Sequence, residues 1–200
     1  MFDIICVTNR ILCREPFLTR MERLAAARPA AVILREKDLP EAEYRALAAQ
    51  VLALCRKTGV SCILHSFAGA AKELDCPALH LPLPLLRTLP PEDRARFSVL
   101  GASCHSEAEA EEAEALGATC ITAGHVFDTD CKKGVPGRGL EFLRRVCESV
   151  SIPVYAIGGI GKENLSAVAA CGAAGACVMS GAMTCADPAA YLAELRGASK

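Results

Sequence analysis

Short apolar runs alternate with longer amphipathic segments along the whole chain. The apolar runs are nearly continuous instead of alternating with polar residues, which is typical of strands covered on both faces. They lie at residues 4–8, 31–35, 62–65, 78–81, 98–103, 119–123, 154–158 and 176–179. Because helical segments separate these strands, the pattern predicts an α/β fold with a parallel sheet.

The segments between the strands include amphipathic helices, predicted at 41–58, 107–116, 140–150, 164–170 and 188–196. Helix 41–58 has the clearest apolar face, formed by Tyr44, Leu47, Ala48, Val51, Leu52, Leu54 and Cys55. Ser106 is placed to cap helix 107–116. A glycine follows three of the helices, at the position where a left-handed residue ends a helix: Gly59, Gly117 and Gly172.

Eight strand–helix units without a linker predict that residues 1–200 form a single (β/α)8 TIM barrel, near the lower size limit of about 200 residues. A doubly wound open sheet is the competing layout. The small residues Gly158 and Gly159 follow the seventh strand, and Ser180 and Gly181 follow the eighth. Such turns let backbone amides approach an anion, and phosphate sites of barrels commonly lie after these two strands. They therefore favour the barrel.

Composition excludes several classes of protein. Hydrophobic residues make up 52% of the chain, which excludes disorder, and the net charge of −1 provides no general field for nucleic acid. An uninterrupted apolar run of about 18 residues, as a membrane span needs, does not occur. Residues 1–7 enter a strand directly, without the basic start of a signal peptide. We therefore expect a cytoplasmic protein that binds neither nucleic acid nor membrane.

Twelve cysteines are many for a chain of this length. Without an export signal or any Cys-x-x-Cys pair, they indicate free, mostly buried thiols instead of disulfides or a zinc site. Cys131 differs, because it follows an aspartate and precedes two lysines in a polar segment, where nearby cations favour a thiolate.

The four histidines are the main candidates for chemistry. They are His65, His80, His105 and His125, and their spacing and the lack of an accompanying carboxylate argue against a metal site. His80 lies inside an apolar strand and is interpreted as a core residue. His125 is the favoured acid–base group, because it opens a loop with small neighbours and two lysines after the sixth strand. A polar crossover loop without chemistry is the alternative.

Two cations follow the second strand. Arg35 and Lys37 are two residues apart, so in extended chain their side chains point the same way. Such a pair suits a carboxylate or phosphate, although a solvated charge cluster is the alternative. Lys132 and Lys133 raise the same question, and we expect one of them to face inward.

Six segments together resemble the thiamin phosphate synthase/TenI superfamily over nearly the whole chain. They are 34–37 (LREK), 101–105 (GASCH), 124–134 (GHVFDTDCKKG), 137–139 (GRG), 153–160 (PVYAIGGI) and 178–181 (VMSG). The resemblance implies a TIM barrel that binds a thiazole phosphate at the carboxyl ends of its strands. Within the superfamily, the chain is most similar to the TenI-type thiazole tautomerases, which have His at the position of His125 followed by the same Thr-Asp-Cys-Lys-Lys-Gly run.

The resemblance also implies roles for individual residues. His125 would shuttle a proton in the conversion of a non-aromatic thiazole phosphate carboxylate to its aromatic tautomer, without metal or other cofactor. Substrate contacts are expected from Arg35, Lys37, Ser103, His105, Thr129, Lys132, Gly137, Gly159, Ser180 and Gly181. Barrels of this type often pair, so a homodimer is compatible with the sequence.

Two alternatives remain open. The synthases of the superfamily join a pyrimidine diphosphate to the thiazole phosphate with magnesium, using an Asn-Asp pair after the third strand and an Asp after the fourth. Those places here hold His65-Ser66 and residues 81–84 (LPLP), which argues against this activity. A non-catalytic regulator that binds thiazole or thiamin phosphate would keep the phosphate turns but would not need His125.

Overall fold

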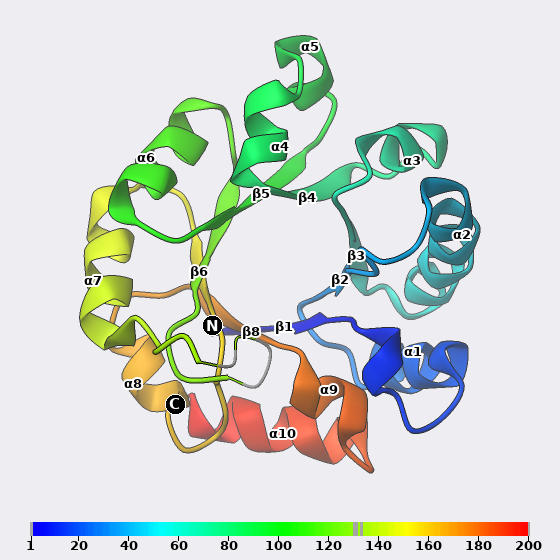
Figure 1. Cartoon of the computed structure of the whole chain (residues 1–200). Helices are drawn as coiled ribbons and strands as arrows, with labels where there is room; N and C mark the ends of the chain where they lie inside the picture. The colour runs from blue at the N-terminus through cyan, green and yellow to red at the C-terminus, as the bar shows by residue number, and fades with distance from the viewer. Residues whose placement is uncertain (1, 130–131, 133, 200) are drawn as a thin grey trace.

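The computed structural model describes residues 2–129, 132 and 134–199, and its parallel strands close into a barrel (Figure 1). The strands follow one another around the barrel in chain order, and β1 pairs with β8 to close it. They are β1 (Asp3–Val7), β2 (Ala31–Leu34), β3 (Ser61–His65), β4 (Ala78–Pro82), β5 (Val99–Cys104), β6 (Cys120–Gly124), β7 (Val154–Ile157) and β8 (Gly175–Val178). The predicted (β/α)8 barrel is confirmed, and the open sheet is excluded.

Helices surround the barrel on its outside (Figure 1). They are α1 (Phe17–Ala26), α2 (Glu41–Thr58), α3 (Ala68–Glu73), α4 (Leu83–Thr88), α5 (Pro91–Arg94), α6 (Glu107–Ala115), α7 (Gly139–Ser149), α8 (Leu165–Ala169), α9 (Ser180–Thr184) and α10 (Pro188–Ala198), with a 3-10 turn η1 at Arg10–Leu12. No helix in the described part of the chain is long and apolar enough to cross a membrane.

Helix α2 shows how the sequence pattern leads to packing. It covers the predicted residues 41–58 and buries Tyr44, Ala48, Val51, Leu52 and Cys55, five members of the predicted apolar face. Gly59 ends the helix with a φ of 71°, where a residue without Cβ avoids the steric cost of the left-handed region. Ser106 caps α6 as predicted, because its hydroxyl accepts a hydrogen bond from the Glu109 N–H at 3.1 Å.

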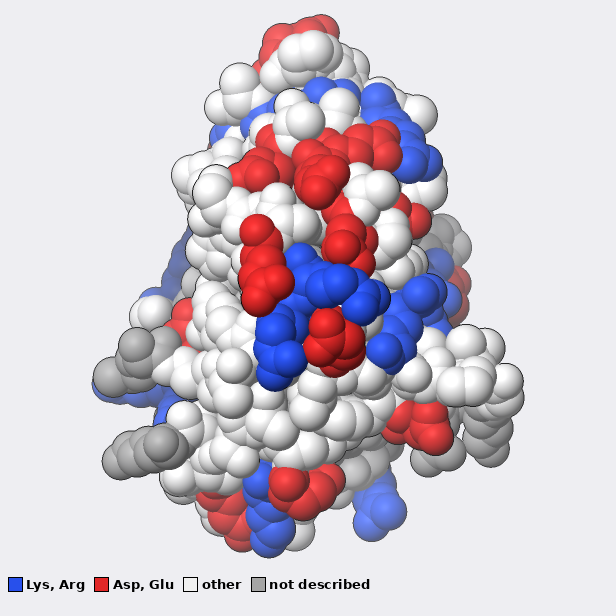
Figure 2. All heavy atoms as spheres, turned by 90° about the vertical axis from the view of Figure 1, so that its left-hand side faces the viewer, with Lys and Arg blue, Asp and Glu red and all other residues white. Residues whose placement is uncertain are grey.

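Opposite charges are interspersed on the face formed by α6 and α7, where Figure 2 shows basic side chains beside acidic ones. Arg145 pairs with Glu107 at 2.7 Å, and Arg87 pairs with Glu112 at 2.7 Å. These side chains are exposed, so each pair contributes little to stability. The mixture of signs gives this face no uniform basic field for a polyanion.

The cysteines are free thiols wherever the structure describes them, and most are buried. Burial raises the pKa of Cys6 to about 12, so this thiol stays protonated and packs as a small apolar side chain. Cys131 lies outside the described residues.

Tyr44 joins the ends of β2 and β3. It is fully buried, its hydroxyl donates to the Leu34 carbonyl at 2.7 Å, and it accepts from the His65 N–H at 2.8 Å. The Tyr44→Phe variant leaves both backbone groups without this partner, so we expect the free energy of unfolding to fall by about 1–3 kcal/mol. Urea denaturation measures this loss. Tyr155→Phe is the control, since the Tyr155 hydroxyl makes one long contact with Asp3 at 3.4 Å; equal losses in the two variants would contradict the bridging role.

Candidate active site

A cavity of about 630 Å³ opens at the carboxyl ends of the barrel strands. All eight strands contribute to its wall through their last residues or the turns that follow them. The structure brings ten of the predicted site residues together there: Arg35, Lys37, Ser103, His105, His125, Thr129, Lys132, Gly159, Ser180 and Gly181. This is the end of the barrel at which TIM-barrel enzymes carry their active sites.

Gly137 is the predicted substrate contact that does not line this cavity. Its N–H donates to the Asp128 carboxylate at 2.7 Å, and a Cβ there would lie 2.7 Å from the Phe127 backbone. The glycine therefore lets the segment after β6 fold back on itself. Of the two predicted loop lysines, Lys132 faces the cavity, whereas Lys133 lies outside the described residues.

His125 is buried at the cavity wall, with 4% of its surface exposed. Its Nε2 lies 3.1 Å from the carbonyl oxygen of Val135. Because a carbonyl only accepts, Nε2 carries the ring hydrogen in this contact, and the lone pair of the neutral imidazole is on Nδ1. Nδ1 is buried and has no hydrogen-bond partner among the described residues. The ring is thus held through Nε2, whereas Nδ1 is not bonded to any residue that the structure describes.

His105 lies beside His125 in the cavity wall. Its Nδ1 donates to the carbonyl of Gly124 at 2.7 Å, and its backbone N–H donates to Glu109 at 2.6 Å. His105 is therefore tied to the strand that precedes His125, and its lone pair is on Nε2.

The wall at β3, β4 and β5 is polar but uncharged. His65 and His80 pair in register, and their rings stack at 5.6 Å. His80 is buried and contacts the Ser103 hydroxyl at 3.0 Å through Nε2, which confirms it as a core histidine. Burial lowers the pKa of His65 to about 2, with contributions from His80 and Arg35, and burial lowers that of His80 to about 4. Both rings are neutral near pH 7.

Cations line the cavity on two opposite sides of the barrel, after β2 and after β6. Arg35 and Lys37 both line it after β2, as the two-residue spacing predicts, and Lys132 lines it after β6. In contrast to the neutral wall, each of these cationic positions favours an anionic group, and Glu163 after β7 adds a negative charge to the wall.

The turns after β7 and β8 complete the wall with main-chain groups. Gly159 lines the cavity in the first turn, and Ser180 and Gly181 line it at the start of α9. Asn164, which sequence reasoning missed, holds the first turn: its side chain accepts from the Gly161 N–H at 3.0 Å and donates to the Gly159 carbonyl at 2.9 Å. Its position three residues after Gly161, before a helical run, is the signal that could have shown it.

The residues after β3 and β4 supply no carboxylate for a magnesium ion. Mg²⁺ binds oxygen ligands that usually include one or two carboxylates. β3 ends here in His65 and is followed by Ser66, β4 ends in Pro82, and a carboxylate that lines the cavity, Glu163, follows β7 instead. Within the described residues, no three His, Cys, Asp or Glu side chains gather in a way that could hold a metal ion.

The closed parallel barrel with histidines and cations at its carboxyl end defines the chain as a TIM barrel with an enzyme-like site. A family model described as thiamine monophosphate synthase matches residues 4–182. The chain belongs to the thiamine monophosphate synthase family.

The names of proteins with similar sequences are consistent with this family. The chain is 33% identical to a thiamine-phosphate synthase of Syntrophomonas wolfei, over 93% of this chain and 90% of the relative. It is 33% identical to a putative thiamine-phosphate synthase 2 of Aquifex aeolicus, over 81% of this chain and 87% of that protein. A solved thiamine phosphate pyrophosphorylase from Pyrococcus furiosus superposes with a TM-score of 0.84 at 29% identity, covering 99% of this chain and 95% of that one. These names favour the synthase alternative over the tautomerase.

Proposed function

We propose that this member of the family is a thiazole tautomerase that converts the non-aromatic thiazole phosphate carboxylate to its aromatic tautomer in thiamin biosynthesis. The observation that carries the proposal is the state of His125, a buried cavity imidazole with Nε2 bonded to a carbonyl and Nδ1 without a described partner. An imidazole suits this chemistry because its pKa is ordinarily near neutrality, so it both accepts and returns a proton.

The reaction is an isomerisation that moves one proton. His125 removes the proton from the ring carbon that bears the carboxylate, the electron pair of that C–H bond shifts into the ring to form the aromatic system, and the pair of the exocyclic double bond moves to the vinyl carbon. The imidazolium, supported by the Val135 carbonyl at Nε2, then gives a proton to the exocyclic vinyl carbon. The bonding changes balance without an oxidant, and aromatisation provides the driving force.

The remaining predicted contacts bind the two anionic groups of this substrate. Gly159, Ser180 and Gly181 would hold the phosphate through main-chain and hydroxyl donors, and Lys132 would assist. Arg35 and Lys37 would face the carboxylate and stabilise the negative charge that grows as the carbon loses its proton. The uncharged wall with His65 and Ser103 would border the ring. The homodimer stays a prediction.

Thiamine-phosphate synthase activity is the second candidate, favoured by the names of the relatives. It needs a site for a divalent cation and a diphosphate, and the residues after β3 and β4 do not supply the carboxylates. A single experiment separates the two candidates. The protein is given the non-aromatic carboxylate in one NMR sample, and a pyrimidine diphosphate with thiazole phosphate and Mg²⁺ in another.

The expected result is aromatisation in the first sample at a rate unchanged by excess EDTA, and no joined product in the second. The physical reason is that an imidazole does the proton transfer without a Lewis acid. A protein known to be magnesium-dependent serves as the control that the chelator is effective. Magnesium-dependent joining of the two heterocycles, with no acceleration of aromatisation, would replace the isomerase with the synthase.

A further inference from the structure

We infer that Glu36 is a positioning residue that orients Arg35 and Lys37 toward the carboxylate of the substrate. The inference rests on the proposed function for the identity of that carboxylate. Glu36 stands between the two cations in the sequence, yet 1% of its surface is exposed and it does not line the cavity.

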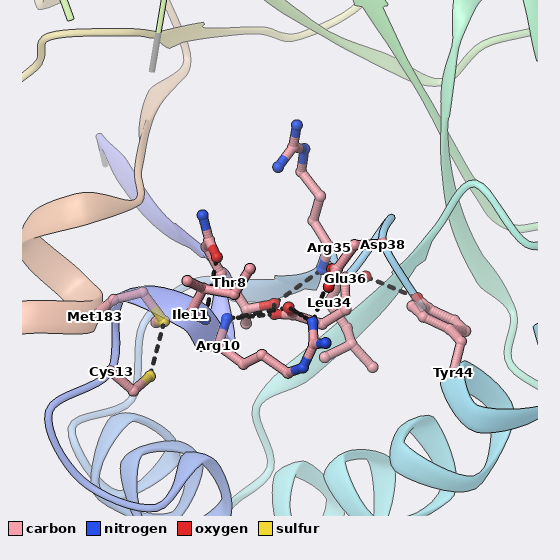
Figure 3. Close-up of polar contacts among 11 residues, drawn as sticks. Thr8, Arg10, Ile11, Cys13, Leu34, Arg35, Glu36, Asp38, Tyr44 and Met183 are labelled. Atoms are coloured by element: carbon pink, nitrogen blue, oxygen red, sulfur yellow. Dashed lines mark hydrogen bonds and ion pairs between the residues drawn. The ribbon is translucent and has the colours of Figure 1, made fainter. Parts of the chain in front are cut away.

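The contacts of Glu36 tie the segment after β2 to the segment after β1. Its Oε1 accepts from the Thr8 hydroxyl at 2.6 Å, and both carboxylate oxygens lie 3.0 Å from the Arg10 N–H. Arg10 adds a guanidinium contact to Oε2 at 3.3 Å. A single side chain thus satisfies donors of two residues on the neighbouring segment, as Figure 3 shows.

A second hydrogen bond fixes the backbone at the base of the cation pair. The Arg35 N–H donates to the hydroxyl oxygen of Thr8 at 2.9 Å, while the same hydroxyl donates to Glu36. Arg35 and Glu36 follow β2 directly, and neighbouring side chains of a strand point to opposite sides, so anchoring Glu36 against the segment after β1 directs Arg35 the other way. Lys37 lies in the turn that the Leu39 N–H closes on the Glu36 carbonyl at 3.2 Å, so fixing Glu36 also fixes the start of this turn. Figure 3 shows the Arg35 side chain extending away from the cluster of contacts around Glu36, and both cations line the cavity.

The surroundings of Glu36 favour a negatively charged carboxylate. The groups that face it are hydrogen-bond donors, namely the Thr8 hydroxyl and the N–H and guanidinium of Arg10. Glutamine has one acceptor oxygen in place of two, and its amide nitrogen would face a donor. The hydrogen bonds from this side chain to Thr8 and Arg10 would then weaken. The side chains of Arg35 and Lys37 would no longer be held in one direction, even though both positive charges remain.

The test measures ligand discrimination, which general loss of structure does not alter. Two probes are titrated by calorimetry: the aromatic thiazole phosphate carboxylate and the same thiazole phosphate without the carboxylate. Their phosphates are identical, so the ratio of the two dissociation constants reports how much the carboxylate contributes to the affinity. We expect the wild type to prefer the carboxylate-bearing probe by about tenfold or more, because charge-assisted hydrogen bonds have that strength.

In Glu36→Gln, we expect the preference to fall to about threefold or less while the affinity for the probe without the carboxylate is kept. Adding Glu36→Gln to an Arg35→Ala/Lys37→Ala protein should change the affinity for the carboxylate-bearing probe by less than about twofold, because Glu36 acts through these two cations. If Glu36→Gln does not fold, Thr8→Val gives the same readout, with Thr8→Ser as the rescuing variant.

Asp38→Asn is the matched control. Asp38 binds the same Arg10 at 2.7 Å but is exposed, and Arg10 lowers the pKa of its carboxyl. This variant should keep the wild-type preference. The inference is overturned if the wild type shows no preference, if neither probe binds, if Glu36→Gln weakens both probes equally, or if its effect persists without the cations. Probes that discriminate as expected in a protein that does not aromatise the substrate would overturn the proposed function alone.

Discussion

Replacing His125 with asparagine is expected to lower the rate of aromatisation by about 10²- to 10⁴-fold, the usual contribution of a general acid–base group. Asparagine keeps a polar side chain that can donate a hydrogen bond, but its amide does not act as a general acid or base near neutral pH. Binding of the aromatic product should change little, because the cations and the phosphate turns remain. Single-turnover NMR gives the rate, and calorimetry gives the affinity.

His105→Asn is the control for this prediction. His105 also lines the cavity, but its Nδ1 is bonded to the Gly124 carbonyl, and we expect a clearly smaller loss of rate. A protein in which His105→Asn abolishes turnover and His125→Asn retains it would show that the proton-transferring residue has been assigned to the wrong histidine.

Gly158→Ala should disturb both stability and the position of His125. Gly158 has a φ of 102°, and a Cβ added there would overlap the Cβ of His125 and lie 2.8 Å from its Cα. The left-handed backbone and the steric overlap together should lower the free energy of unfolding by about 2–5 kcal/mol. The displaced imidazole should also lower the turnover number. Urea denaturation and steady-state kinetics measure the two effects.

The Gly172→Ala variant separates the effect of the backbone conformation from the effect of the steric overlap. Gly172 has a similar φ of 89°, but its added Cβ would meet only the Cys147 Cβ at an ordinary 3.6 Å. We expect a loss of about 1–2 kcal/mol from the backbone conformation alone and an unchanged turnover number. If Gly158→Ala is no more damaging than Gly172→Ala and keeps full activity, close packing at Gly158 does not position His125.

The strands could be predicted from the sequence because each is an unbroken apolar run, the pattern that a parallel strand buried on both faces requires. Helix α2 could be predicted for the related reason that its buried residues recur at helical spacing. Helix α1 and the short helices α3, α4, α5 and α9 are not among the predicted elements. α4 and α5 start among prolines, which sequence reasoning reads as loops although proline is well placed in a first helical turn.

Most of the predicted site residues line the cavity because strand ends meet at one end of a closed barrel, so His125, Arg35 and Ser180 gather despite their separation in the chain. The anchoring of Glu36 could not be predicted. Its partners Thr8 and Arg10 are 28 and 26 residues away, and only the side-by-side pairing of β1 and β2 brings them to it. The contact between His125 Nε2 and the Val135 carbonyl likewise comes from a turn ten residues further on.

The most direct test of the central claim is an NMR time course of the non-aromatic thiazole phosphate carboxylate in D2O, with wild-type protein at several concentrations. The account predicts that the non-aromatic signals disappear at a rate proportional to protein concentration and that aromatic thiazole signals replace them. Signals that decay no faster with protein than in buffer alone would contradict it.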